Sequence, residues 1–404
     1  MRLLEKIMRN NLSWIKLLTQ QLLIVIVLLN IVSLPLLWIG WGEIPYTDKS
    51  NEKFRYHVNP SHYYPHPYIG YTRTKNQDIE EINLDSDLAW SVFKTSGFVR
   101  EKHPTILIVG GSVAMHISSN RYDHQPLDES LGEFTFSKSL LSHYPNAEFR
   151  VVNAAYGGKK QPQQYLSTVY LDLLGLSYDM VINIDGFNEI ALPIRENNDQ
   201  FTPVIFPRSF FKIVTGFSKG ECRVSWGGKP SYIPFWDFYR SIKLRVCIAD
   251  IRNPNVWFKH GKNLEENDAI NQSIDIWKES SNKLFEFLQK REKMYIHAIQ
   301  PNQYLEDSKP LSNDEEEKAL IFNNELSSHH SVIVRDHYLR LDSNLLKSEA
   351  ITDLRYLFAS TSETLYRDSC CHLNDKGMIL MADQIISENE KLFGEMLSFN
   401  QPFE

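Results

Sequence analysis

A serine follows a glycine pair directly after an apolar run, in the stretch ILIVGGSVAMH at residues 106–116. In this position Ser112 either caps a helix or presents its hydroxyl as a nucleophile. Nucleophilic serine chemistry needs a base that takes the hydroxyl proton, an acid that orients the base, and N–H donors for the developing oxyanion. The remainder of the chain has to supply these groups if Ser112 is a nucleophile.

Polar residues and glycines also follow the other predicted strands. They lie in the stretches NAAYGG at 153–158, DGFNE at 185–189 and, late in the chain, DSCCH at 368–372. Because ligands bind at the carboxyl ends of the strands of a parallel sheet, we expect these stretches to meet at one edge. Together they contain a hydroxyl, an imidazole, carboxylates and N–H donors, which are the groups that acyl transfer from an ester requires.

Four blocks in this order resemble those of the SGNH/GDSL-family hydrolases. Gly110-Gly111-Ser112 resembles the family's first block, Gly-Asp-Ser, and NAAYGG resembles its second block. Gly186-Phe187-Asn188-Glu189 resembles the third block, Gly-x-Asn-Asp. The segment from Asp368 to His372 resembles the last block, Asp-x-x-His. The resemblance covers about residues 105–395. It implies a three-layer α/β/α, flavodoxin-like fold with a parallel central sheet, and hydrolysis or transfer of an acyl ester.

The resemblance also implies a catalytic triad. Ser112 is the expected nucleophile, His372 the general base and Asp368 the acid that orients it. The chain departs from the family at two points: Gly111 replaces an Asp behind the nucleophile, and Asp368 and His372 are four residues apart rather than three. A bulged turn can absorb the extra residue; otherwise the acid comes from elsewhere, with Asp375 a weaker candidate, or a backbone carbonyl completes a Ser–His dyad.

The oxyanion hole implied by the resemblance consists of the backbone N–H groups of Ser112 and Gly158 and the side-chain amide of Asn188. Gly157 is the alternative glycine, and Glu189 is expected either to support Asn188 or to stabilise a helix dipole. An amide suits this role because it donates without titrating. Glycines suit it because they let the backbone approach the substrate oxygen closely.

The chain contains four cysteines, and no CxxC pair or His/Cys spacing indicates a metal site, so neither a metal nor a cofactor is expected. A bridge between Cys222 and Cys247 is the expected pairing in an oxidising compartment. Cys370 and Cys371 are poorly placed to bridge each other and are expected to be packed thiols. His116, one helical turn after Ser112, is expected to be a solvated bystander.

The elements that position these groups follow from hydrophobic periodicity. Apolar runs predict strands at 105–110, 148–155, 179–186 and 294–299, and periodic apolar residues predict helices at 127–144, 161–176, 264–291 and from Asn374 to about 397. Such an alternation predicts a parallel sheet that helices cover on both faces. Two insertions interrupt this pattern. The first, at 195–262, is rich in aromatic residues and is expected to be a lid, a subdomain or a segment that contacts the membrane. The second, at 305–350, is polar, and its acidic run SNDEEEK is expected to be a solvated face.

The N-terminal region contains an uncharged, mostly apolar stretch at 17–42, long enough to cross a bilayer as a helix. Basic residues precede it, which predicts a cytoplasmic segment 1–16, a membrane span 17–42 and an extracytoplasmic remainder. A cleaved signal peptide is the alternative, but its apolar region would be shorter. Residues 43–95 are predicted to be a stalk that lies against the domain, and residues 96–399 the hydrolase-like domain.

The composition is that of a globular protein, with 42% hydrophobic and 23% charged residues among 404. The formal net charge of −7, with no basic stripe, excludes nucleic acid as an expected partner. The expected partners are the lipid bilayer, an acylated glycan or other ester substrate, and proteins of polysaccharide biosynthesis.

These features favour a membrane-anchored esterase that acts outside the cytoplasm on acyl esters, above all O-acetyl esters, of a glycan or cell-surface polymer. Two alternatives remain open. The first is an O-acyltransferase that uses the same site. The second is a catalytically degenerate protein of this fold that binds or assembles glycans, and the stretched Asp368-to-His372 spacing is its best support.

Overall fold

The structure is a computed structural model that describes residues 64–66, 68–72, 91–118, 135–196, 264–320, 325–348 and 350–398, with seven residues between 21 and 31. The chain divides into two compact units, Met1–Val58 with Gly216–Val256, and Asn59–Thr215 with Trp257–Glu404. Nearly all described residues belong to the second unit. The Cys222–Cys247 pair and most of the predicted 17–42 span and 195–262 insertion lie outside the described residues. None of the helices in the described ranges combines the length and the apolar character needed to cross a bilayer.

The second unit contains a six-stranded sheet in the order β3-β5-β4-β6-β7-β8. Its strands are β3 (Ser91–Lys94), β4 (Thr105–Gly110), β5 (Arg150–Asn153), β6 (Met180–Asp185), β7 (Met294–Ile299) and β8 (Ile351–Asp353). The strands from β4 to β8 are parallel, and β3 pairs antiparallel with β5 at the edge. Numbered along the chain, the parallel strands have the order 2-1-3-4-5, which is the flavodoxin-like order. The predicted α/β fold with a mostly parallel sheet is confirmed.

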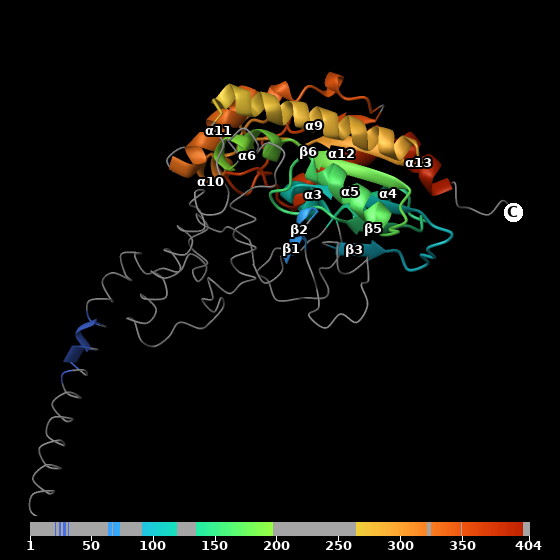
Figure 1. Cartoon of the computed structure of the whole chain (residues 1–404), viewed down its shortest axis with the longest axis horizontal. Coiled ribbons are helices and arrows are strands. Elements are labelled where there is room, and N and C mark those ends of the chain that lie inside the picture. Colours follow the sequence, from blue (N-terminus) through green and yellow to red (C-terminus); the bar gives the residue numbers. More distant parts are fainter. Residues whose placement is uncertain are drawn as a thin grey trace, which may run out of the picture. The chain divides into compact units, whose positions relative to one another are not determined.

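Helices connect these strands and lie on both faces of the sheet (Figure 1). They are α3 (Ser112–Ile117), α4 (Thr135–His143), α5 (Gln163–Leu173), α6 (Phe187–Glu196), α9 (Glu266–Gln289), α10 (Asn313–Lys318), α11 (Glu325–His337), α12 (Asp375–Glu388) and α13 (Glu390–Ser398), with 3-10 turns at Tyr338–Arg340 and Ser343–Leu345. On one face α5 packs beside α9, and on the other α12 packs against α4 and α3.

The core explains why the strands are apolar throughout. Every residue of β4 and β6 is buried, because helices cover both sides of each strand. Leu107 and Val181 pack with Leu171 of α5 and Leu284 of α9 in one continuous apolar cluster. Successive side chains along each strand point to opposite faces of the sheet. The helices thereby fix the strands, and the strands fix the loops at their carboxyl ends.

The N-terminal extension contributes structure to this unit. The antiparallel pair β1 (Tyr64–His66) and β2 (Gly70–Thr72) lies in the segment predicted as a stalk, and so does β3. The Tyr71 hydroxyl donates to the Gly157 carbonyl at 2.7 Å, and the hydroxyls of Thr72 and Tyr156 are 3.0 Å apart. Since β3 is part of the central sheet, the domain begins earlier than the predicted boundary at residue 96.

The last predicted helix is in fact two helices. As predicted, Asn374 caps the first of them, accepting the Gly377 N–H at 2.9 Å. The single helix to residue 397 is wrong, because the chain leaves helical geometry at Asn389, with φ −117° and ψ 25°. The buried Asn389 amide donates to the Thr352 hydroxyl and to the Ile385 carbonyl, both at 2.8 Å, and these bonds hold the break in place.

The acidic run at 312–318 is not simply a solvated face. Ser312 and Glu315 form a capping box at the start of α10, and Glu315 is fully buried. Its Oε2 accepts from Lys309 Nζ at 2.7 Å, and its Oε1 accepts the backbone N–H groups of Leu365 and Tyr366 at 2.7 and 2.8 Å. The prediction of a solvated face is wrong for Glu315. Its charge can be buried because Lys309 and two backbone N–H groups compensate it, and the N–H groups come from a distant part of the chain. Glu315 therefore anchors the segment that leads to Asp368.

The Glu315→Gln substitution is expected to destabilise the fold strongly, because it leaves the buried Lys309 ammonium without a counter-charge. We expect the free energy of unfolding in urea to fall by about 3–5 kcal/mol. Glu316→Gln, at the exposed neighbouring position, is the matched control and should change stability by less than about 0.5 kcal/mol. Equal stability of the two variants would contradict a structural role for the Lys309–Glu315 pair.

Candidate active site

Ser112 lies at the junction of β4 and α3, where the strand ends at Gly110 and the helix begins. Gly111 is the N-cap residue, so the Ser112 hydroxyl does not cap the helix. Gly110 has φ +148°, and a Cβ there would lie 2.1 Å from the Ile184 carbonyl oxygen, so only glycine fits this turn. The Ser112 Oγ lies 2.7 Å from Nε2 of His372.

The position of Ser112 in the sheet is that of a ligand site. Strand β4 lies between β5 and β6, where the direction of strand addition reverses. At such a switch point the loops that follow neighbouring strands diverge and leave a crevice at the carboxyl edge. The turn after β4 leads to Ser112 at the start of α3, the loop after β5 carries Gly158, and the turn after β6 leads to Asn188 in the first turn of α6. The expected oxyanion donors Gly158 and Asn188 therefore follow the two strands that flank β4.

Asp368 binds His372 directly, despite the four-residue spacing. Asp368 Oδ2 lies 2.6 Å from His372 Nδ1. Its other oxygen, Oδ1, accepts the backbone N–H groups of Cys370 and His372 at 3.0 and 3.3 Å. The carboxylate thus folds the intervening residues into a turn that absorbs the extra position. Asp375 is the first residue of α12, as expected.

A short antiparallel ladder supports this turn. The Arg367 N–H donates to the His372 carbonyl at 3.0 Å, and the Asn374 N–H donates to the Leu365 carbonyl at 2.8 Å. The ladder leaves residues 368–371 as the tip of a hairpin, with Asp368 and His372 on its two arms. The two side chains meet because the backbone brings both arms together.

The electrostatics of the pair suit a general base. Burial favours neutral groups, but the Asp368 carboxylate beside Nδ1 outweighs it and raises the pKa of His372 above the ordinary value. Burial likewise works to raise the pKa of Asp368, but the charge and hydrogen bonds of His372, with a contribution from Arg367, hold it well below the usual range. The acid therefore stays ionised while the imidazole titrates.

Asn188 and Gly111 fit each other closely. Asn188 Nδ2 donates to the Lys159 carbonyl at 2.7 Å, which leaves its second N–H for another acceptor. A Cβ at Gly111 would lie 2.4 Å from this Nδ2. The absence of a side chain at Gly111 therefore makes room for the Asn188 amide. Gly158 lies two residues after Tyr156 in the same loop as Lys159, with φ +75°.

Glu189 ties together the two loops of the expected oxyanion hole. The side chain is buried, and its Oε1 and Oε2 accept the backbone N–H groups of Gln161 and Gly186, both at 2.9 Å. Burial and the neighbouring Asp185 charge raise the pKa of Glu189 to about 8. Its role is thus to position the loops that follow β5 and β6 rather than to balance a helix dipole at the surface.

His116 is closer to the site than the sequence suggested. Its ring centroid lies 5.2 Å from that of His372, and its Nδ1 lies 3.2 Å from Arg367 Nη2. The prediction of a solvated bystander is therefore wrong. Arg367 was not singled out at all, although it directly precedes Asp368 in the sequence. The sequence signal that could have identified Arg367 is its position next to Asp368, a predicted acid.

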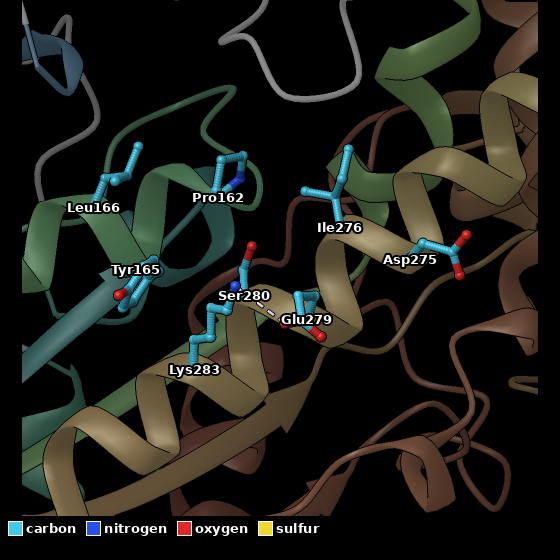
Figure 2. Close-up of a pocket in the computed structure, with 8 residues that line it drawn as sticks. All are labelled: Pro162, Tyr165, Leu166, Asp275, Ile276, Glu279, Ser280 and Lys283. Atoms are coloured by element: carbon cyan, nitrogen blue, oxygen red, sulfur yellow. Dashed lines mark ion pairs between the residues drawn. The ribbon is translucent and has the colours of Figure 1, made fainter. Parts of the chain in front are cut away.

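A cavity of about 430 Å³ lies between α5 and α9, away from these residues. Figure 2 shows Pro162, Tyr165 and Leu166 on one side and Ile276 with Ser280 on the other. Glu279 and Lys283 form an ion pair of 3.1 Å at its edge. The lining includes none of the residues of the Ser112 site, so this cavity does not hold the group that Ser112 would attack.

The sequence matches no protein-family model and no curated protein. Among solved structures, an α/β hydrolase enzyme, LAE5, from the metagenome of Lake Arreo in Spain is 12% identical, with a TM-score of 0.34 over 73% of this chain and 97% of that one. A second structure, of a putative GDSL-like lipase from Parabacteroides merdae, is 11% identical with a TM-score of 0.32. That match covers 72% of this chain and 96% of the lipase chain. TM-scores of this size do not establish a common fold, so the chemistry of the site rests on the side-chain geometry.

The reaction of Ser112 with a fluorophosphonate, which modifies activated serine hydroxyls, should depend on pH. His372 accepts a proton only when it is neutral, so the labelling rate should rise as pH increases through an apparent pKa above about 6.5. Asp368→Asn should slow labelling and move the midpoint to lower pH, because it removes the charge that favours the imidazolium. Asp375→Asn is the control and should keep the wild-type profile. A rate that does not vary with pH would contradict this role for His372.

Gly111→Ala should slow the same labelling reaction by displacing the Asn188 amide. We expect a loss of about 10²–10³-fold, similar to that of Asn188→Ala, since each removes one donor to the developing oxyanion. The double variant should be little slower than either single variant, because both remove the same interaction. Gly394→Ala, where an added Cβ meets nothing within 4 Å, is the control. Additive losses in the double variant would show that Gly111 acts independently of Asn188.

Proposed function

We propose that this protein is a serine ester hydrolase in which Ser112 is the nucleophile, His372 the general base and Asp368 the orienting acid. One observation carries the proposal: an unbroken relay of hydrogen bonds. It runs from Ser112 Oγ to His372 Nε2 at 2.7 Å, and from His372 Nδ1 to Asp368 Oδ2 at 2.6 Å. These two short hydrogen bonds put the base His372 in direct contact with the Ser112 hydroxyl, and the ionised acid Asp368 in direct contact with His372.

In the acylation step, Ser112 Oγ attacks the ester carbonyl carbon while His372 Nε2 takes its proton. The carbonyl oxygen becomes an oxyanion, which the N–H groups of Ser112, Gly158 and Asn188 stabilise. The C–O bond to the alcohol then breaks, and the leaving oxygen takes the proton back from His372. The products are the free alcohol and an acyl ester on Ser112.

In the deacylation step, His372 takes a proton from water as the water oxygen attacks the acyl carbon. The same donors stabilise the second oxyanion. Collapse of this intermediate releases the carboxylic acid and returns the proton from His372 to Ser112 Oγ. If a sugar hydroxyl replaces water in this step, the product is a new ester, so the same residues would support an acyltransferase.

The relay argues against a degenerate site. The spacing of Asp368 and His372 was the best support for that alternative, and the turn at 368–371 accommodates it. For the substrate, we propose O-acetyl esters of an extracytoplasmic glycan or cell-surface polymer. This part of the proposal draws on the resemblance to SGNH/GDSL hydrolases and on the apolar N-terminal stretch of the sequence.

Hydrolysis of p-nitrophenyl acetate tests the proposed activity. Ser112→Ala should lower kcat by at least about 10³-fold, because the nucleophile is absent. Ser142→Ala is the matched control: Ser142 lies on α4 and its hydroxyl donates to the Ser139 carbonyl at 2.7 Å. It should retain wild-type kcat. Folded protein without turnover, or equal turnover in the two variants, would refute the hydrolase.

Release of acetate from O-acetylated polysaccharides tests the substrate class. We expect the wild-type protein to release acetate and Ser112→Ala to release none. Adding a non-acetylated sugar acceptor separates the two reactions, since a transferase would convert it to an acetylated product. Turnover of p-nitrophenyl acetate without any release from polysaccharides would contradict the proposed substrate and leave the hydrolase in place.

A further inference from the structure

Two cysteines directly precede His372, and neither takes part in the proposed hydrolysis. Cys370 and Cys371 carry thiols rather than a disulfide, and their Sγ atoms lie 3.2 Å apart. One donor atom from each of Cys370, Cys371 and His372 lies within 4.8 Å of the other two. The hairpin tip thus holds two sulfur ligands and one nitrogen ligand within reach of a single ion.

Hydrogen bonds fix the backbone of this cluster. Gln303 Nε2 donates to the carbonyl oxygens of Asp368 and Cys370 at 3.1 and 3.2 Å. The Tyr304 hydroxyl donates to the Ser369 carbonyl. The Cys370 N–H donates in turn to the Asp368 carboxylate at 3.0 Å. Because the backbone that carries the donor side chains is held in place before an ion arrives, binding has less ordering entropy to overcome.

The donor set matches the preferences of thiophilic cations. Thiolate and imidazole are favoured ligands of Zn²⁺ and of softer ions such as Cd²⁺. Zn–S bonds of about 2.3 Å at a tetrahedral angle place two sulfurs about 3.8 Å apart. The observed separation of 3.2 Å is shorter than this, so the two sulfurs move apart by about 0.6 Å when they bind an ion tetrahedrally. Cys370 is half-buried and Cys371 is buried, so an ion reaches the cluster from the Cys370 side.

We propose that Cys370, Cys371 and His372 form an inhibitory site for a thiophilic divalent cation such as Zn²⁺ or Cd²⁺. The ion forms bonds to two sulfurs and one imidazole nitrogen, and the two thiol protons pass to solvent, so nothing is oxidised or reduced. Both ring nitrogens of His372 already serve the relay, at 2.6 Å from Asp368 and 2.7 Å from Ser112. A nitrogen that binds the ion therefore leaves the relay. The inhibition rests on the proposed hydrolase, whereas the binding does not.

Titration of the reduced full-length chain with Cd²⁺ tests the binding, read from the ultraviolet Cd–thiolate charge-transfer band. One ion per chain should saturate the band at the cluster. Cys370→Ser and Cys371→Ser should each weaken Cd²⁺ binding at least about 10-fold. The Cys222→Ser/Cys247→Ser double variant retains the cluster and controls for the other two cysteines; it should bind as the wild type does. His372→Ala should weaken Zn²⁺ binding in competition with Cd²⁺.

Turnover of p-nitrophenyl acetate with and without Zn²⁺ tests the inhibition. The wild-type rate should fall at least about 10-fold on saturation and recover when a chelator removes the ion. Each cysteine variant, compared with its own rate without metal, should resist the same Zn²⁺ concentration. A band that survives in Cys370→Ser and Cys371→Ser, or saturation without loss of turnover, overturns the proposal. Binding in a protein that turns over no ester would refute the hydrolase but not the metal site.

Discussion

The hydrogen bond between Ser112 Oγ and His372 Nε2 joins two residues that are 260 positions apart in the chain. A contact of 2.7 Å between such distant segments holds only if both are fixed independently. Ser112 is fixed by the sheet. The buried strands β4 and β6 set the position of the turn, and the glycine at position 110 allows the chain to pass within van der Waals distance of the Ile184 carbonyl. The neighbouring loops are then joined to one another through the buried carboxyl group of Glu189.

His372 is fixed by a different set of contacts, none of them in the sheet. A ladder of backbone hydrogen bonds closes the hairpin, and the Asp368 carboxylate shapes its tip. Glu315 then binds the backbone at the start of the hairpin, with Lys309 as its counter-charge. A buried ion pair contributes little net stability compared with an apolar pair, but its loss is costly. In this protein the Lys309–Glu315 pair acts by positioning, because it fixes the start of the hairpin that carries Asp368 and His372.

The sequence was sufficient to predict those features that depend on local pattern. Continuous apolar runs located β4, β6 and β7, and the polar residues at their ends located the stretches that meet around Ser112. Other features depend on contacts that no local pattern contains. The strand β3 mixes apolar and charged residues because it lies at an edge, and Glu315 looked solvated because its backbone partners lie about fifty residues later in the chain. The helix break at Asn389 depends on Thr352 in β8, and the position of His116 depends on Arg367.

The separation of Ser112 and His372 has a consequence for the timing of biosynthesis. A domain generally folds as a unit, so its early segments wait for the late ones during synthesis. The residues of the strand and turn that present Ser112 are synthesised long before the ribosome reaches position 372. Until the hairpin closes, the serine has no base and behaves as an ordinary hydroxyl. The nascent chain would therefore pass through synthesis without a reactive nucleophile, and the site would be assembled only when the end of the domain folds.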